Sequence, residues 1–128
     1  MRIAKRSRRG AGGDTVGFPG VDFYGIEEML LEDERAVRDL VRGFVDAEVL
    51  PIIEACAWEG RFPVELVPKM AAMNLFGATM SDYGLPGLNN VAYGLLTQEL
   101  ERGDSGLRSF VSVQSALVMY PIYTFGSK

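Results

Sequence analysis

The sequence predicts an all-α protein, an antiparallel helical bundle whose helices are joined by short connections. Two patterns predict it. Apolar residues recur at spacings of three and four along much of the chain, and no stretch alternates like a strand or carries a hairpin signal. The chain has 128 residues, of which 48% are apolar and 23% charged, so it is long enough for one globular domain with its own core.

Residues 1–20 are predicted to be a flexible basic tail, and residues 21–128 the helical domain. The first nine residues hold five bases and no acid, and "GAGG" follows them. This start lacks the apolar stretch of a secretory signal. The alternative to a flexible tail is a targeting peptide of another kind, such as an Arg-rich transit peptide. The rest of the chain has eight bases against 17 acids, so its net charge is −9 and nucleic acid is not expected as a partner.

Several kinds of site are excluded by composition. The chain has no histidine, which rules out His-based catalytic triads and most zinc sites. Cys56 is the only cysteine, so no internal disulfide can form, and no Gly-rich phosphate loop of either common spacing is present. The uncharged run from Ser109 to Ser127 is interrupted by polar residues, and it predicts a packed core helix rather than a membrane span.

The clearest helix follows a short approach segment, "DFYGIEEML", which we expect to form one or two helical turns. Its first turn carries Glu32, Asp33 and Glu34, where the helix dipole favours acids. Pro51 should kink or break this helix late. One face is apolar, formed by Val37, Leu40, Val41, Phe44, Val45, Val49, Ile52 and Ile53.

Two more helices are predicted in the middle of the chain. One starts with Pro63 near its first position and ends before Gly77. Its buried stripe is formed by Leu66, Val67, Met70 and Met73. After a loop over residues 81–90, the next helix spans residues 90–102, and Gly103 is expected to end it in the left-handed position that glycine suits.

A fourth helix is predicted to begin at Asp104, acting as its N-cap, and to end near Met119, because Pro121 disfavours a helical residue before it. Arg108 is then the fourth helical residue, and Ser112 lies one turn further on the same face. The guanidinium, the hydroxyl and the helix N-terminus together suit a carboxylate ligand. The residues alone leave a second interpretation open, in which Arg108 forms a structural ion pair with an acid such as Asp104 or Glu101.

Three stretches of the chain carry a family resemblance: "RDLVRGFVDAEVLPIIE", "GRFPVELVPKMAAMNLFGA" and "ELERGDSGLRSFVSVQSALVM". They closely resemble the N-terminal helical domain of acyl-CoA dehydrogenases, and the glutaryl-CoA dehydrogenase branch in particular. The resemblance covers about residues 22–127. It implies an FAD enzyme that oxidises an acyl-CoA at the α–β bond, uses a glutamate as base and passes electrons to an electron-transfer flavoprotein. The glutaryl branch also decarboxylates its product to crotonyl-CoA.

The resemblance also implies roles for three residues. Arg108 and Ser112 match the arginine and serine that hold the distal carboxylate of the substrate, and Glu101 matches a glutamate near that end of the pocket. Two positions depart from the family pattern. Leu31 stands where a Thr or Ser cap is usual, and Leu107 replaces an aromatic residue found in some relatives.

Family enzymes are much longer than this chain, so the resemblance predicts a fragment that is incomplete at its C-terminus and inactive alone. The catalytic glutamate and nearly all of the FAD site would lie beyond residue 128, and no residue of this chain is assigned to catalysis, cofactor or metal. The full enzyme would be a homotetramer in the bacterial cytoplasm or the mitochondrial matrix. Two alternatives stay open: a non-catalytic association module or pseudoenzyme remnant, and a dehydrogenase of another short acyl-CoA.

Overall fold

The computed structural model describes residues 22–127, and the predicted basic tail lies outside them. The all-α prediction is confirmed, since the described residues form helices and no strand. In chain order the elements are α1 (Ile26–Met29), α2 (Glu32–Phe44), the π-helix η1 (Val45–Val49), α3 (Leu50–Trp58), the 3-10 turn η2 (Val64–Leu66), α4 (Val67–Ala72), α5 (Asn90–Gly103), α6 (Ser105–Val113), the π-helix η3 (Gln114–Met119) and α7 (Tyr120–Phe125).

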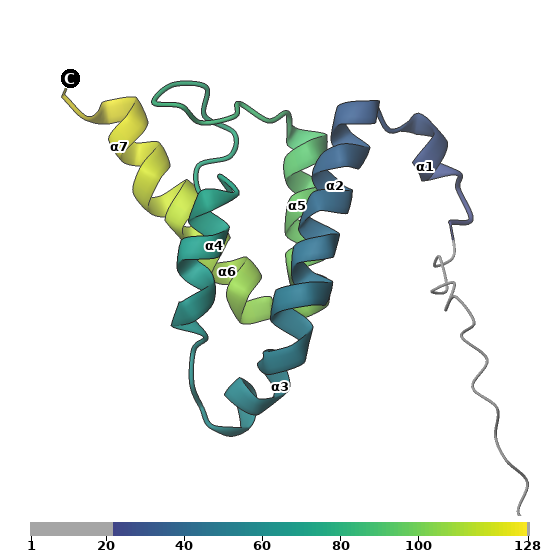
Figure 1. The fold of residues 1–128 in the computed structure, drawn as a ribbon. Coiled ribbons are helices and arrows are strands. Elements are labelled where there is room, and N and C mark those ends of the chain that lie inside the picture. The colour runs from purple at the N-terminus through teal and green to yellow at the C-terminus, as the bar shows by residue number, and fades with distance from the viewer. Residues whose placement is uncertain (1–21, 128) are drawn as a thin grey trace, which may run out of the picture.

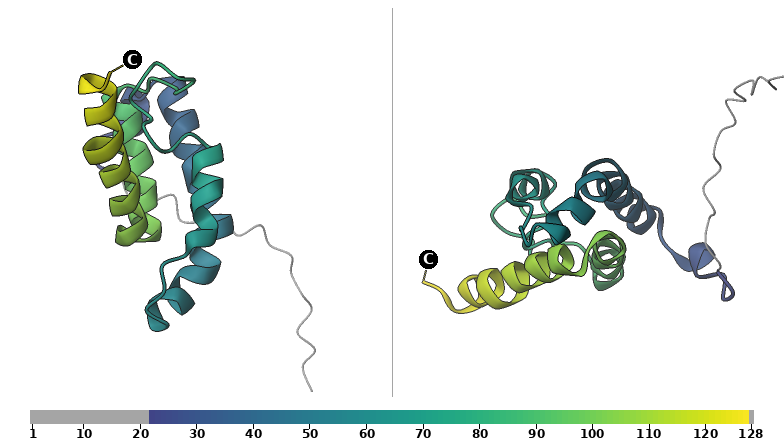
Figure 2. Two further views of the ribbon diagram at one scale, coloured as in Figure 1. Left: turned by 90° about the vertical axis from the view of Figure 1, so that its left-hand side faces the viewer. Right: turned by 90° about the horizontal axis from the view of Figure 1, so that it is seen from below.

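The core is formed by side chains from most of the helices. Helices α2 and α5 lie side by side, and α6 turns away from the end of α5 (Figure 1). Side chains from α2, η1, α4, α5 and α6 meet in one buried cluster. Seen from below, α6, η3 and α7 form one rod that extends away from the pair of α2 and α5 (Figure 2). The buried cluster therefore covers only the first part of that rod.

Pro51 does not break the helix that contains it, so of the predicted kink or break, the break is wrong. The π-helix η1 comes directly before α3, and the Leu50 N–H donates to the carbonyl of Val45, five residues back. A proline lacks the N–H of the usual helical bond, and its ring crowds the carbonyl four residues before it. The wider π turn makes room for that ring, so the helix continues to Trp58.

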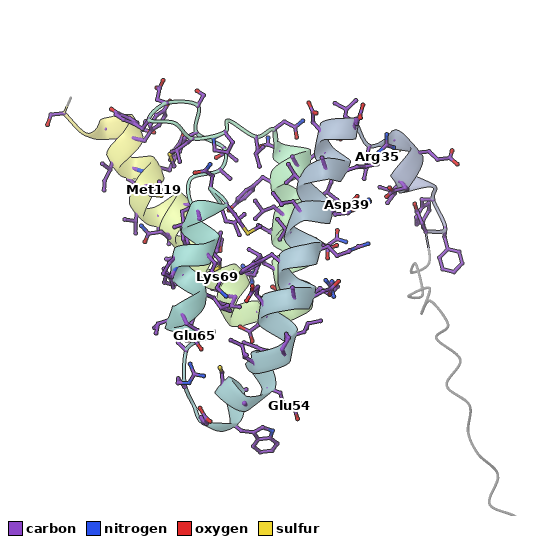
Figure 3. The ribbon with its side chains drawn as sticks, viewed as in Figure 1. Arg35, Asp39, Glu54, Glu65, Lys69 and Met119 are labelled. Carbon is purple, nitrogen blue, oxygen red and sulfur yellow. The ribbon has the colours of Figure 1, made fainter. Side chains whose placement is uncertain are left out.

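The same arrangement recurs at Pro121, and the predicted end near Met119 is wrong. In η3, which contains Met119 (Figure 3), the helix again widens just before the proline. The Tyr120 N–H donates to the carbonyl of Ser115, five residues back, and α7 continues to Phe125. A rule that each proline interrupts a helix fails here because a π turn absorbs the ring.

Helix α4 ends earlier than expected. Its last residue is Ala72, and the first left-handed residue after it is Asn74, with φ 55°, three residues before Gly77. The Leu75 N–H then donates to the carbonyl of Met70 at 3.1 Å. This bond satisfies a carbonyl of the last turn of α4, as is common where a left-handed residue ends a helix.

The N-cap residue of α2 has no side-chain acceptor, and a glutamate from the first turn holds the start of the helix instead. Leu31 is the N-cap, and Oε2 of the buried Glu34 accepts a hydrogen bond from its N–H at 2.9 Å. The other oxygen of Glu34 accepts from Nδ2 of Asn89 at 2.8 Å. Asn89 is itself the N-cap of α5, and its Oδ1 accepts from the N–H of Ala92. One carboxylate thus joins the beginnings of α2 and α5.

Gly103 is not the left-handed residue that the sequence predicted. It is the last residue of α5, and Asp104, in an extended conformation, both ends α5 and begins α6. A Cβ on Gly103 would lie 2.9 Å from Cγ1 of Val45 and 3.2 Å from Cγ1 of Val49. The glycine is needed because α5 approaches η1 too closely for a side chain.

The variant Gly103→Ala is expected to lower the free energy of unfolding by about 1–3 kcal/mol, because the added methyl overpacks this contact. Gly94→Ala on the same helix is the matched control. A Cβ there meets nothing within 4 Å, so alanine should be neutral or stabilise by up to about 1 kcal/mol. Urea unfolding of both variants measures the difference. Equal stabilities would contradict the close approach.

The apolar rod is only partly the packed core helix that was predicted. Leu107 and Val111 on α6 are fully buried, as a core helix requires. Further along, Leu117, Ile122 and Phe125 are 70%, 67% and 83% exposed. The described residues therefore leave the second half of the rod uncovered. Within residues 22–127, no helix combines the length and the apolar character needed to cross a bilayer.

Candidate functional site

The N-terminus of α6 has the local geometry that the sequence predicted. Asp104 is the N-cap, and its Oδ1 accepts a hydrogen bond from the N–H of Leu107 at 2.8 Å. The Arg108 N–H donates to the Asp104 carbonyl at 3.1 Å, which opens the helical ladder. Arg108 is therefore the fourth helical residue, and Ser112 follows it by one turn. Leu107 packs in the core cluster.

The three residues assigned by resemblance lie together. The Arg108 Nε donates to Oε2 of Glu101 at 2.7 Å, and its Nη1 lies 3.5 Å from Oγ of Ser112. The Ser112 hydroxyl donates to the carbonyl of Ser109 at 3.0 Å. Of the two acids considered from sequence, Glu101 and not Asp104 forms the ion pair with Arg108. Among the described residues, none accepts a hydrogen bond from Nη2 of Arg108.

Ser105 is a fourth member of this cluster, and the sequence analysis missed it. Its hydroxyl donates to Oε1 of Glu101 at 2.6 Å. The hydrogen bond from Ser105 and, second to it, the bond from Arg108 lower the pKa of Glu101. Glu101 is therefore a carboxylate at neutral pH. The spacing of four residues between Glu101 and Ser105 could have indicated this contact. It was not used because a helix boundary at Gly103 separates the two residues.

The cluster lies at the surface of the described residues. The side chains of Arg108 and Glu101 are 38% and 47% exposed. One hollow, of about 410 Å³, opens on a neighbouring face of α6, and its lining does not include Arg108 or Ser112. It is lined by Phe62, Gly106, Ser109, Phe110, Val113 and Gln114. This hollow therefore does not enclose the guanidinium of Arg108.

Neither hollow fits a flavin dinucleotide. The second, about 210 Å³, lies between α7 and the loop before α5, and its lining is almost wholly apolar. It is formed by Met80, Tyr83, Leu85, Met119, Ile122 and Tyr123. No Lys or Arg lines either hollow, whereas the diphosphate of a flavin dinucleotide calls for cationic groups. We therefore assign no FAD contact to either hollow.

A buried charged cluster next to the site also escaped the sequence analysis. Glu99 on α5 is 1% exposed, and its two oxygens accept hydrogen bonds from Arg42 Nη2 at 2.7 Å and Arg102 Nε at 2.8 Å. Arg102 also donates to Oδ1 of Asp46 at 2.7 Å. The cluster fixes α5 against α2 just before the helix boundary that leads to Arg108.

Comparison with known proteins identifies the family. The family described as "Acyl-CoA dehydrogenase, N-terminal domain" matches residues 31–128. Two solved structures of glutaryl-CoA dehydrogenase from Mycobacterium smegmatis share the fold. The one in complex with FADH2 has a TM-score of 0.79 and 41% identity, covering 82% of this chain and 27% of that chain. The other has a TM-score of 0.78 and 44% identity, with 81% and 27% covered.

Curated relatives are more varied in their names. The mitochondrial short-chain specific acyl-CoA dehydrogenase of Bos taurus is 31% identical over 100 residues, which is 77% of this chain and 24% of the relative. The 3-(aryl)acrylate reductase of Clostridium sporogenes is 31% identical over 97 residues, or 75% and 26%. The chain spans about a quarter of the length of these relatives. On this evidence, the chain belongs to the acyl-CoA dehydrogenase family and matches its N-terminal domain.

Proposed function

We propose that this chain is the substrate-recognition part of an FAD-dependent acyl-CoA dehydrogenase whose substrate is glutaryl-CoA. One observation carries the proposal. Arg108 and Ser112 present a guanidinium and a hydroxyl from one face of α6, with Nη1 and Oγ 3.5 Å apart. The identity of 41–44% to glutaryl-CoA dehydrogenase supports the same substrate class. The flavin and the catalytic base would come from outside this chain.

The chemistry of the substrate explains why a cation is useful there. A glutaryl group ends in a carboxylate, and moving that charge out of water is costly unless a partner meets it. A charge-assisted hydrogen bond contributes roughly 1.5–3 kcal/mol. An unsubstituted acyl chain gains nothing from such a cation. The task of Arg108 and Ser112 would be to bind the far end of the substrate and orient it.

Glu101 limits how the substrate carboxylate can bind. Because Glu101 occupies Nε of Arg108, a second carboxylate has to approach the Nη groups and Ser112. Two carboxylates on one guanidinium repel each other, and the Ser112 hydroxyl would offset part of that repulsion by turning its proton from the Ser109 carbonyl to the substrate. Arg108 can therefore form the ion pair with Glu101 through Nε and bind a ligand carboxylate through its Nη groups, so the two interpretations are compatible.

A chimeric dehydrogenase tests the proposal. Residues 31–127 replace the matching segment of the Mycobacterium smegmatis glutaryl-CoA dehydrogenase, with which this chain shares 41–44% identity. We expect the flavin-loaded chimera to prefer glutaryl-CoA over butyryl-CoA in kcat/KM by at least about tenfold, equivalent to about 1.4 kcal/mol. Steady-state kinetics with both thioesters gives the ratio. A loaded chimera that prefers butyryl-CoA would instead support another short acyl-CoA as substrate.

The alternative of a non-catalytic association module rests on a different observation. The second half of the rod exposes large apolar residues, Leu117, Ile122 and Phe125 among them. Apolar surfaces of this kind commonly bind another protein surface. An association module predicts a chimera that folds and loads flavin without oxidising either thioester. The first proposal also includes an electron-transfer flavoprotein as electron acceptor and a homotetrameric enzyme. Both would be abandoned if the chimera oxidised neither thioester.

A further inference from the structure

We propose that Ser105 is a positioning residue for substrate recognition: it fixes the Glu101 carboxylate so that Arg108 keeps its Nη groups available beside Ser112. This inference rests on the proposed function, because it concerns how the same arginine meets a substrate carboxylate. It adds a residue outside the trio of Arg108, Ser112 and Glu101, and it gives Glu101 the task of orienting the arginine.

The geometry divides the two oxygens of Glu101 between two donors. Oε1 accepts the Ser105 hydroxyl at 2.6 Å, and Oε2 accepts Nε of Arg108 at 2.7 Å. A carboxylate held by both oxygens cannot rotate freely about its last bond. Its contact with the guanidinium is limited to Nε, so Nη1 remains directed at Oγ of Ser112.

Without the Ser105 hydroxyl, Glu101 would become a competitor of the substrate. Its side chain is 47% exposed, and among the described residues only Ser105 and Arg108 donate hydrogen bonds to its carboxylate. Carboxylates prefer two parallel bonds to a guanidinium over one. Once released, Glu101 can use both oxygens on Arg108 and cover donors that a substrate carboxylate needs. The expected consequence is weaker binding of dicarboxyl acyl thioesters only.

Ser105 does not carry the fold of α6. Asp104 supplies the N-cap bond, to the N–H of Leu107. Ser105 is exposed, and it is the first residue of the helix. The variant Ser105→Ala therefore removes one hydroxyl from an exposed first turn and leaves the helix and the core cluster intact. Ser105→Thr keeps the hydroxyl and serves as the rescue variant.

Carbon-13 NMR of the Glu101 carboxyl in the 128-residue chain tests the contact without any activity. Loss of a donor to the charged form raises the pKa of a carboxyl group, so removal of the Ser105 hydroxyl should raise the pKa of Glu101. We expect this rise in Ser105→Ala and none in Ser105→Thr. The matched control is Ser109→Ala on the same helix. An unchanged Glu101 pKa in Ser105→Ala would overturn the positioning role.

Kinetics in the chimera tests the consequence for substrate. We expect Ser105→Ala to raise the KM for glutaryl-CoA about fivefold, equivalent to about 1 kcal/mol, with kcat nearly unchanged and no effect on butyryl-CoA. The effect should vanish in a Glu101→Ala background, because the hydroxyl acts through that carboxylate. If Arg108→Ala weakens glutaryl-CoA use and Ser105→Ala does not, this inference fails and the proposed function stands. If Arg108→Ala has no effect, the proposed function fails.

Discussion

Replacing both arginines beside Glu99, in the double variant Arg42→Ala with Arg102→Ala, is expected to lower the free energy of unfolding by about 3–5 kcal/mol at pH 7. Glu99 is 1% exposed and keeps its charge because Arg42 and Arg102 donate to its two oxygens. Without them a carboxylate stays buried with no partner. Urea unfolding by circular dichroism measures the loss.

The opposite replacement should cost much less. The side chains of Arg42 and Arg102 are 45% and 38% exposed, so both guanidinium groups can turn to water when the carboxylate is removed. Glu99→Gln is therefore expected to cost about 1–2 kcal/mol. A triple variant that adds Glu99→Met to the two arginine changes should recover most of the loss, because no buried charge remains. Equal costs for the Glu99→Gln and double-arginine variants would contradict this account.

The pH dependence has a definite sign. Burial raises the pKa of Glu99, but the hydrogen bonds from Arg42 and Arg102 outweigh it, and the pKa lies below the usual range for glutamate. The wild-type cluster therefore stabilises the fold above the ordinary glutamate pKa, and the stability is lost as the pH falls through the lowered value. In the double variant only burial acts on Glu99, so its pKa rises and the deficit should shrink as pH falls from 7 towards 4.

Arg108→Ala in the chimeric dehydrogenase is expected to lower kcat/KM for glutaryl-CoA by about 10- to 150-fold, equivalent to 1.5–3 kcal/mol. Under the proposed function, the loss would arise because the distal carboxylate of glutaryl-CoA loses its cation while Glu101 remains nearby. The value for butyryl-CoA should stay within about threefold. Steady-state kinetics with the two thioesters measures both effects.

Arg61→Ala is the matched control for that experiment. Arg61 also pairs with acids, Glu59 and Glu65, and its side chain is 44% exposed, close to the 38% of Arg108. Its removal should leave kcat/KM for both thioesters unchanged, since exposed ion pairs contribute little to stability. An equal loss for glutaryl-CoA and butyryl-CoA in Arg108→Ala would mean that Arg108 supports the fold rather than the distal carboxylate.

Sequence reasoning succeeded where the structure depends on neighbours along the chain. The Asp104 cap, the position of Arg108 in the first turns of α6 and the one-turn step to Ser112 all follow from helical spacing. Glu101 was already named as one possible partner of Arg108. Choosing it over Asp104 required the actual path of the chain across the helix boundary.

Sequence reasoning failed for one local feature, the π turn before a proline, and for one feature set by a distant segment, the close approach at Gly103. The π turns before Pro51 and Pro121 widen the helices locally, and the rule that a proline ends or kinks a helix does not predict them. Gly103 was predicted to be a left-handed residue because glycine commonly ends helices. The position needs glycine for another reason, which is that η1 packs too closely for a side chain. Spacing along a chain carries no information about which remote backbone comes close.

The sequence by itself determined the helices, the N-cap at Asp104 and the shared face of Arg108 and Ser112, because bonds between residues three and four apart decide all of these. Only the tertiary structure decided that Glu99 is buried against Arg42, 57 residues away, and that η1 leaves no room for a side chain at position 103. Those contacts depend on how whole helices pack, and helices pack by the shape of their combined surfaces rather than by any local pattern.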